Sequence, residues 1–145
     1  MSLNLYKYHS DPESLDGFDE YMHQNPDVAY DIALNRGHAS EQLEDAIATD
    51  AWYSYLYAKD VLKGERVEKI EDAIATDAYY SYLYARDVLS GERFEKGEDA
   101  IATSALYSYW YAQDVLSGER FEKGEDAIRG SKYQKRYEEL TGVKL

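Results

Sequence analysis

The chain has 145 residues, enough for one domain of ordinary size, and its 29 Asp and Glu against 16 Lys and Arg give a net charge of −13. The absence of cysteine excludes a disulfide framework, a thiolate metal site and a cysteine nucleophile. The acidic balance disfavours direct binding to nucleic acid, which normally requires a basic face. No stretch approaches the roughly 18 apolar residues of a membrane-spanning helix, and the N-terminus lacks the apolar core of a signal peptide. We therefore expect no membrane association and a cytoplasmic location.

The segment Glu-Asp-Ala-Ile occurs four times, always 27 residues apart, beginning at Glu44, Glu71, Glu98 and Glu125. A repeat period of this size is typical of stacked supersecondary units. The sequence therefore predicts an all-α fold, a short α-solenoid of stacked helix pairs with a 27-residue period. We expect a single helical-repeat domain over residues 1–145, with an N-terminal cap (1–18), a degenerate repeat (19–43), three full repeats (44–70, 71–97 and 98–124) and a C-terminal cap helix (125–145).

Two proline-containing segments predict helix starts near the N-terminus. Asn25-Pro26 places a capping residue before a proline at the first helical position, which is a strong start signal, and Asp11-Pro12 repeats it upstream. Asn25 aligns with Asp50 of the first full repeat, so we expect the long helix of the degenerate repeat to begin there.

Residues 71–97 illustrate the expected folding unit. Asp77 is predicted to cap a long helix from Ala78 to Leu89, with Gly91 ending it. A shorter helix is predicted from Glu95 to about Ala102. Because Gly97 inside that helix costs up to ~1 kcal/mol relative to Ala, the helix must depend on tertiary packing.

The last predicted helix has its own start and stop signals. Ser131 and Gln134 have the spacing of a capping box, and the helix should continue to Leu140 and end at Gly142. Unlike the earlier helices, it carries Lys132, Lys135 and Arg136. A more polar end unit is what a solenoid needs in order to stop growing.

The long helix of the first full repeat is apolar on most of its sides. At 100° per residue, Tyr53 and Tyr57 lie nearly opposite the predicted core stripe. That stripe comprises Ala51, Tyr55, Ala58 and Leu62. Since a helix that is apolar all round is buried all round, we interpret most of the 16 tyrosines as packing residues.

The repeats differ mainly along one helix face, about 100° from the core stripe. We call this face the variable stripe. Trp, Tyr and Arg dominate interface energetics, so the stripe is a candidate partner-binding surface. The change from Trp52 and Leu56 to Leu106 and Trp110 roughly conserves volume, which packing against a neighbouring repeat would also require, and both interpretations stay open. The candidate binding residues are Trp52, Leu56, Lys59, Tyr79, Leu83, Arg86, Leu106, Trp110 and Gln113.

The repeated charges do not form a recognisable catalytic pattern. Acid–base catalysis needs two carboxyl groups in unlike environments, whereas repetition gives them like ones. We expect an Asp–Arg ladder made by Asp60, Asp87, Asp114, Arg66, Arg93 and Arg120. The three histidines, His9, His23 and His38, match no metal-ligand spacing. The sequence therefore predicts no enzyme, no cofactor and no metal site.

Residues 82–94 (YLYARDVLSGERF) and 11–15 (DPESL) resemble short tandem repeats of tailed-bacteriophage proteins for which no activity is established. The resemblance covers residues 5 to about 128. The chain departs from that pattern at Glu95 and Glu122, where a proline usually follows the aromatic residue. The resemblance implies a viral or bacterial origin, a location in the host cytoplasm if the origin is viral, and interference with a host system.

Recognition rather than reaction is therefore the expected function. We expect a non-catalytic protein-interaction module that binds a protein partner and is a monomer or a weak homo-oligomer. The alternative is an acidic inhibitor or DNA mimic that blocks a host defence or nucleic-acid-binding enzyme, with the Glu-Asp doublets as a ladder of charge. Duplex DNA carries one charge per ~1.7 Å of axis, which is denser than that ladder alone.

Overall fold

The structure is a computed structural model that describes residues 6–145. The regular structure of these residues is helical throughout, without a β-strand, so the all-α prediction is confirmed. The chain divides into two compact units, residues 1–73 and 74–145. The first five residues of the predicted N-terminal cap lie outside the described residues.

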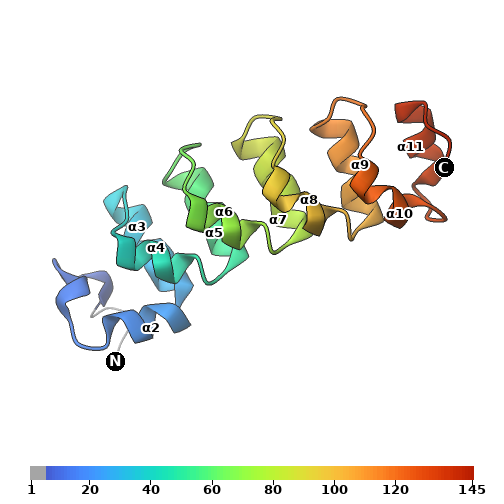
Figure 1. Ribbon diagram of the computed structural model, residues 1–145. Coiled ribbons are helices and arrows are strands. Elements are labelled where there is room, and N and C mark those ends of the chain that lie inside the picture. The colour runs from blue at the N-terminus through green and yellow to red at the C-terminus, as the bar shows by residue number, and fades with distance from the viewer. Residues whose placement is uncertain (1–5) are drawn as a thin grey trace. The chain divides into compact units, whose positions relative to one another are not determined.

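The first unit is built from short helices around an apolar core. Its elements are η1 (Pro12–Ser14), α2 (Phe18–Gln24), α3 (Pro26–Arg36), α4 (Glu41–Ile47), α5 (Ala51–Asp60) and most of α6 (Glu68–Ile74). Helix α4 contacts α2, α3 and α5, and α3 also contacts α5 (Figure 1). Phe18, Met22, Leu43 and Ile47 are almost completely buried between them.

The second unit repeats the pattern of a longer helix followed by a shorter one. Its elements are α7 (Ala78–Leu83), the π turn η2 (Tyr84–Val88), α8 (Glu95–Ile101), α9 (Ala105–Asp114), η3 (Glu122–Gly124), α10 (Glu125–Ile128) and α11 (Gln134–Thr141). Helix α7 contacts α8 and α9, and α9 contacts α10 and α11 (Figure 1). The predicted short helix from Glu95 is confirmed as α8.

The longer helices start where capping side chains stand in the sequence. The carboxylates of Asp50 and Asp77 each accept a hydrogen bond of 2.9 Å from the backbone amide three residues later. The hydroxyl of Ser104 does the same for α9 at 3.2 Å. The predicted cap at Asp77 is therefore confirmed, and each cap satisfies an amide that the first helical turn leaves unpaired.

The two proline signals have different outcomes. Helix α3 begins at Pro26 as predicted, although the Asn25 side chain donates backwards to the carbonyl of Tyr21 at 2.7 Å and does not cap α3. Asp11-Pro12 opens only the single 3-10 turn η1. Leu15 is extended after that turn, so no long helix follows.

The prediction of a continuous α-helix from Ala78 to Leu89 was wrong. The α-helical pattern ends at Leu83, and the amide of Leu89 donates to the carbonyl of Tyr84, five residues back, at 2.9 Å. The same five-residue closure joins Leu62 to Tyr57 and Leu116 to Tyr111. Each closure is followed by a non-glycine residue at positive φ, namely Lys63, Ser90 or Ser117. The wide turn is thus a property of the repeat and not of one copy.

A buried serine joins each longer helix to the short helix before it. Ser54, Ser81 and Ser108 are fully buried, and their hydroxyls each donate at 3.0 Å to the carbonyl of an isoleucine seven residues earlier. The acceptors are the last residues of the short helices, Ile47, Ile74 and Ile101. The serine therefore satisfies a helix-terminal carbonyl that would otherwise lack a partner inside the protein.

Gly97 has a packing role that explains its place inside α8. A Cβ atom added to Gly97 would lie 2.6 Å from the side chains of Ser81 and Phe94, closer than real Cβ contacts. Gly124 meets Ser108 and Phe121 in the same way. Glycine lowers the intrinsic stability of the helix, but its missing Cβ allows a close approach to the neighbouring helix.

The predicted core stripe of α5 is only partly buried. Tyr55 and Ala58 are buried as expected, whereas Ala51 and Leu62 are half-buried. Tyr57, on the opposite side, is only 1% exposed, as expected of a helix that is buried on most of its sides. Its hydroxyl reaches Glu44 on α4 at 2.6 Å, so this side of α5 is also covered.

The last helix begins later than its sequence signal. The hydroxyl of Ser131 accepts from the amide of Tyr133 at 3.1 Å, and the Gln134 side chain accepts from the amide of Gly130 at 2.6 Å. These contacts cap a turn before α11 instead of the helix itself, so the predicted capping box is wrong. The predicted stop at Gly142 is confirmed by its left-handed φ of 77°.

Candidate functional site

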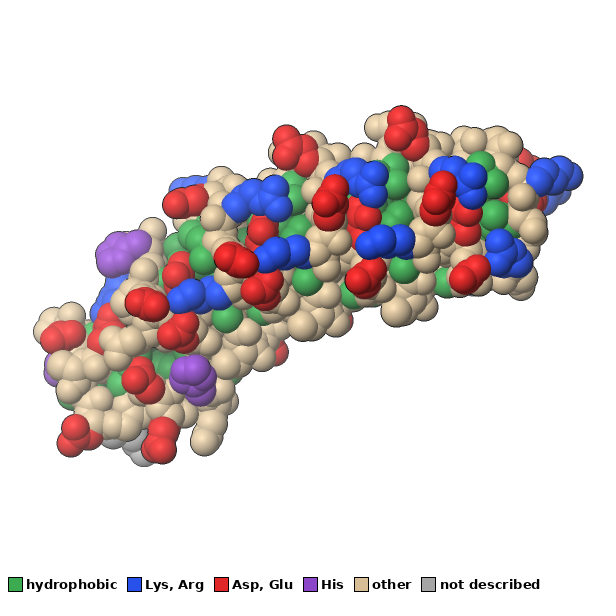
Figure 2. All heavy atoms as spheres, in the orientation of Figure 1, with side chains coloured by type: hydrophobic (Ala, Val, Ile, Leu, Met, Phe, Trp, Pro, Cys, Tyr) green, Lys and Arg blue, Asp and Glu red, His purple; other side chains and the backbone are tan. Residues whose placement is uncertain are grey.

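The first carboxylate of the repeated Glu-Asp-Ala-Ile segment is buried and paired with an arginine. Glu98 is 1% exposed, and the guanidinium of Arg93 donates to both of its oxygens at 2.9 and 2.8 Å. Arg120 binds Glu125 in the same bidentate manner at 3.0 and 2.6 Å, and Arg66 donates to Glu71 at 2.6 Å. Figure 2 shows basic and acidic side chains side by side on this face. Bidentate pairing gives each carboxylate a fixed partner.

The predicted Asp–Arg ladder is therefore wrong. Its arginines pair with glutamates, and its aspartates have other partners. Asp60 and Asp114 accept hydrogen bonds from the hydroxyls of Tyr30 and Tyr82. Asp87 pairs with the adjacent Arg86 at 2.7 Å. The aspartates lie at the C-terminal ends of the tyrosine-rich helical segments, whereas the arginines lie in the loops before the next short helix.

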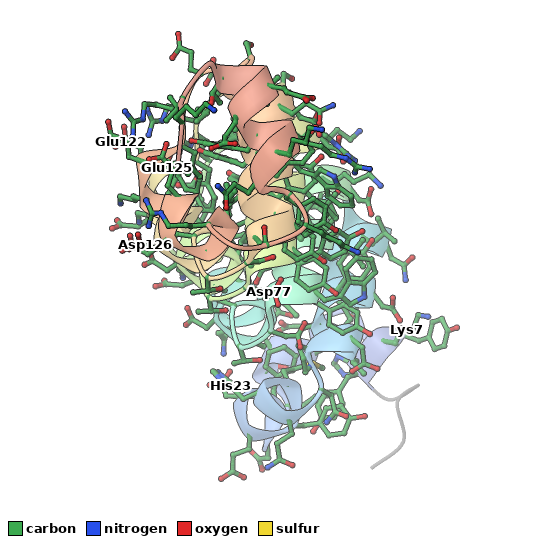
Figure 3. The ribbon with its side chains drawn as sticks, turned by 90° about the vertical axis from the view of Figure 1, so that its right-hand side faces the viewer. Lys7, His23, Asp77, Glu122, Glu125 and Asp126 are labelled. Atoms are coloured by element: carbon green, nitrogen blue, oxygen red, sulfur yellow. The ribbon has the colours of Figure 1, made fainter. Side chains whose placement is uncertain are left out.

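A tyrosine completes the arginine–glutamate pair in the second unit. The Tyr111 hydroxyl donates to Glu98 at 2.6 Å and accepts from the amide of Phe94 at 3.1 Å. Tyr137 does the same with Glu125 at 2.5 Å and Phe121 at 2.8 Å. We call each such arrangement a Glu–Tyr–Arg triad. Figure 3 shows Glu125 nearer the helices than its neighbours Glu122 and Asp126, which lie at the edge of the molecule.

The triads favour fixed protonation states. The Arg120 hydrogen bonds, reinforced by the Tyr137 hydroxyl, hold the pKa of Glu125 below its usual value despite the opposing effect of burial. Burial raises the pKa of Tyr111, and the hydrogen bond to Glu98 raises it further. The Glu125 carboxylate is thus ionised and the Tyr111 phenol neutral at physiological pH. A group held this way stabilises the fold and is poorly suited to exchanging protons in a reaction.

The second carboxylate of each doublet is exposed, and those of Asp45, Asp99 and Asp126 lie beside a basic side chain. Lys69 lies 2.8 Å from Asp45, Lys123 lies 3.0 Å from Asp99, and Arg129 lies 2.8 Å from Asp126. The doublets that begin at Glu71, Glu98 and Glu125 therefore present one exposed carboxylate instead of two, whereas Glu44 is only partly buried. The surface charge of the doublets is lower than their sequence indicates.

The variable stripe is partly exposed and partly buried. Leu83 is buried at 8% exposure, whereas Tyr79 and Trp52 are 40% and 39% exposed. Lys59, Arg86 and Gln113 are also exposed, and Leu56, Leu106 and Trp110 are intermediate. The stripe thus contributes to packing and also leaves aromatic surface open.

In the second unit the stripe joins a cluster of rings. This aromatic cluster consists of Tyr79, Tyr82, Tyr107 and Trp110. Its ring centroids lie 5.4 Å apart for Tyr79 and Tyr107, 5.7 Å for Tyr82 and Trp110, and 5.8 Å for Tyr107 and Trp110. Such spacing is typical of favourable aromatic pairs.

Arg86 extends the aromatic cluster with a positive charge. Its guanidinium lies 5.2 Å from the centre of the Tyr82 ring, donates to the Tyr82 hydroxyl at 3.1 Å and pairs with Asp87. Burial and the hydrogen bond to Asp114 raise the pKa of Tyr82 to about 12, against the opposing effect of Arg86. The rings and the guanidinium form one cation–π surface.

The first unit carries a smaller aromatic surface. The Trp52 ring lies 6.1 Å from that of Tyr55, and the rings of Tyr30 and Tyr53 are 5.9 Å apart. Lys59, at the position of Arg86, is exposed. The stripe residues are therefore brought beside other rings in both units.

The structure adds little to a metal or membrane hypothesis. His9 accepts a hydrogen bond from the amide of Asp11 at 3.0 Å through Nδ1. Within residues 6–145, no three His, Asp or Glu side chains are placed to hold a metal ion together. In the same part of the chain, none of the helices has the length and apolarity needed to cross a bilayer.

The comparisons with known proteins provide no functional assignment, so the function is argued from the residues and contacts of the chain itself. Neither a family model, nor a curated protein, nor a solved structure matches the sequence.

Proposed function

We propose that the chain is a non-catalytic protein-interaction module built as a short α-solenoid with a 27-residue period. Its caps, helix ends and buried serines recur at that spacing. In repeat proteins of this kind each unit packs on its neighbours and the array offers an extended surface.

The observation that carries the proposal is the exposed aromatic surface of the variable stripe. Tyr79 is 40% exposed at the edge of the aromatic cluster, and Arg86 lies over the neighbouring Tyr82 ring. Tyr, Trp and Arg side chains supply most of the energy of protein interfaces, because they bury large areas and also form polar contacts. Glu98 and Glu125 are both buried and each is bound by an arginine and a tyrosine, so they lack the unlike environments that acid–base catalysis needs, which supports recognition over catalysis.

The acidic inhibitor or DNA mimic is the second candidate, favoured by the net charge of −13. It receives less support from the doublets, because Glu71, Glu98 and Glu125 are buried against arginines. A mimic would have to rely on other exposed acids, such as Glu65, Glu92 and Glu119.

Affinity capture with Tyr79→Ala and Trp52→Ala variants tests the proposal. We expect both variants to lose a partner that the wild-type chain retains, with the helical circular dichroism signal unchanged. Tyr8→Ala is the matched control, because Tyr8 is a 74% exposed tyrosine outside the stripe. Capture that survives both stripe variants would contradict the proposal, and capture that duplex DNA or moderate salt abolishes would favour the mimic.

A further inference from the structure

Three of the four repeated glutamates are preceded by an arginine five residues earlier in the sequence, and Glu44 is the one that is not. Arg66, Arg93 and Arg120 precede Glu71, Glu98 and Glu125 by five residues, whereas Ala39 precedes Glu44. The tyrosine of the triad is present, since the Tyr57 hydroxyl donates to Glu44 Oε2 at 2.6 Å. Within the described residues, no Lys, Arg or His side chain lies within ion-pairing distance of Glu44. The first unit thus contains two parts of a three-part arrangement.

A pocket of about 380 Å³ lies beside Ala39, the residue at the position that the arginine occupies in the other copies. Glu44, Tyr57 and Ala39 line it, together with the apolar side chains of Val61, Leu62 and Val67. His38 and Glu65 also line it, so a second carboxylate faces the same space. An apolar wall beside two carboxylates suits a cation on an aliphatic stem.

The internal copies identify the chemistry that this pocket accepts. In the second unit a glutamate whose Oε2 accepts from a tyrosine also binds a guanidinium through both oxygens, at 2.9 and 2.8 Å for Arg93 on Glu98. Glu44 has the same tyrosine contact on Oε2, and among residues 6–145 no hydrogen bond or ion pair reaches its Oε1. A planar guanidinium matches a carboxylate in a bidentate manner, which an ammonium group does not reproduce.

We propose that the pocket around Glu44 binds the guanidinium of an arginine side chain supplied by a partner protein. The incoming group would pair with Glu44 as Arg93 pairs with Glu98, while its stem lies against the apolar wall. The acidic net charge of the chain favours a basic partner segment. The site goes beyond the aromatic surface of the variable stripe and does not depend on it.

An NMR titration of the full chain with N-acetyl-arginine amide tests the site without knowing the partner. We expect saturable shifts of the Gly37, His38 and Tyr57 amides. The isosteric but uncharged N-acetyl-citrulline amide should bind about 10-fold more weakly or not at all, because the charged hydrogen bonds are lost. Equal binding of the two probes, or no shift with the arginine probe, would overturn the proposal, as would a preference for N-acetyl-lysine amide or Ca²⁺.

Three variants locate the binding. Glu44→Gln should lower the affinity for the arginine probe by about 10-fold or more. Ala39→Arg should abolish probe binding and raise the thermal midpoint, because it restores the arginine of the other copies. Asp45→Asn is the matched control, since Asp45 is an exposed carboxylate next to Glu44 but outside the pocket, and it should bind the probe as the wild type does. Unchanged probe binding in Ala39→Arg would contradict the site even if the stripe variants lose their partner.

The source of the arginine is resolved in the same spectra. If a second copy of the chain supplies it, the pocket resonances shift with protein concentration and the probe reverses that shift. If they are independent of concentration, the arginine comes from a different protein. Once the probe titration has shown that the pocket binds a guanidinium, these two results identify the source of the arginine.

Discussion

Glu98 and Glu44 begin the same four-residue segment and accept a hydrogen bond from the same kind of tyrosine, yet their surroundings differ. Glu98 is 1% exposed and bound by Arg93 through both oxygens. Glu44 is only partly buried and lines an open pocket beside Ala39. The carboxylate is fully buried where an arginine compensates its charge and remains accessible where none does, as the cost of burying an unpaired charge requires.

The comparison indicates that the arginine of the triad permits burial and is not needed for the helix pair to form. Helices α4 and α5 contact each other and share the serine hydrogen bond of Ser54, although their glutamate has no arginine. The tyrosine–glutamate contact and the serine are common to both sites. The arginine therefore distinguishes a closed site from an open one.

The largest expected effect comes from removing the arginine of a closed site. Arg93→Met leaves Glu98 buried without its cation, and we expect a loss of about 2–4 kcal/mol in the free energy of unfolding, measured by urea denaturation. The matched control is Arg129→Met, whose partner Asp126 is almost fully exposed, and it should change stability by less than about 0.5 kcal/mol. Similar losses in the two variants would break the distinction between buried and exposed pairs.

The next effect tests the close approach beside the closed site. Gly97→Ala introduces a Cβ that would lie 2.6 Å from Ser81 and Phe94, so we expect a loss of about 1–3 kcal/mol. Thermal unfolding of Gly97→Ala beside Glu95→Ala, an exposed position on the same helix, checks this. A stabilised Gly97→Ala variant would mean that helix propensity outweighs the contact with Ser81.

Removing the tyrosine hydroxyl compares the two sites directly. Tyr111→Phe takes a partner from both Glu98 and the amide of Phe94, and we expect it to cost about 1–3 kcal/mol. Tyr57→Phe removes only the contact with Glu44, which the solvent of the pocket can replace, and should cost about 1 kcal/mol or less. Equal losses in urea denaturation would show that the Glu44 site is as closed as the Glu98 site.

The last expected effect concerns the bidentate pair of the first unit, between Arg36 and Glu13. Hydrogen bonds from Arg36 lower the pKa of Glu13 from 4.5 to about 2. A lowered folded-state pKa adds stability above pH 4.5 that is lost as the pH falls from 4.5 towards 2. We expect Glu13→Gln to remove about 1–2 kcal/mol of the stability difference between pH 5.5 and pH 2.5, followed by circular dichroism. An identical pH profile in the variant would contradict the role of this pair.

The sequence predicts some local helix signals, such as those at Asp77 and Gly142, and misses the charged contacts. Asp77 and Gly142 act locally, through their own backbone neighbours, so their type and position suffice. Arg93 and Glu98 lie five residues apart across a loop–helix junction, where no helical spacing rule applies, and the neighbouring aspartates in register were equally good candidates. The π turn at Tyr84 was also missed, because none of its residues departs from a helical pattern.

The open site could have been found from the sequence. When the four copies are aligned, Ala39 stands at the position of Arg66, Arg93 and Arg120. The alanine indicates an open site only once the arginines are known to bind buried glutamates. The exposure of Tyr79 and the burial of Leu83 could not be derived, since both lie on one helix face, only about 40° apart.

The fit between Ser81, Phe94 and Gly97 limits how such a gene can be rearranged. The first full repeat has Val67 and Ile70 at the positions of Phe94 and Gly97, so the bulky and the small residue change together. Recombination between nearly identical copies preserves this match only when the crossover falls outside those four positions. A crossover inside them would combine phenylalanine with isoleucine or valine with glycine, producing a clash or a void.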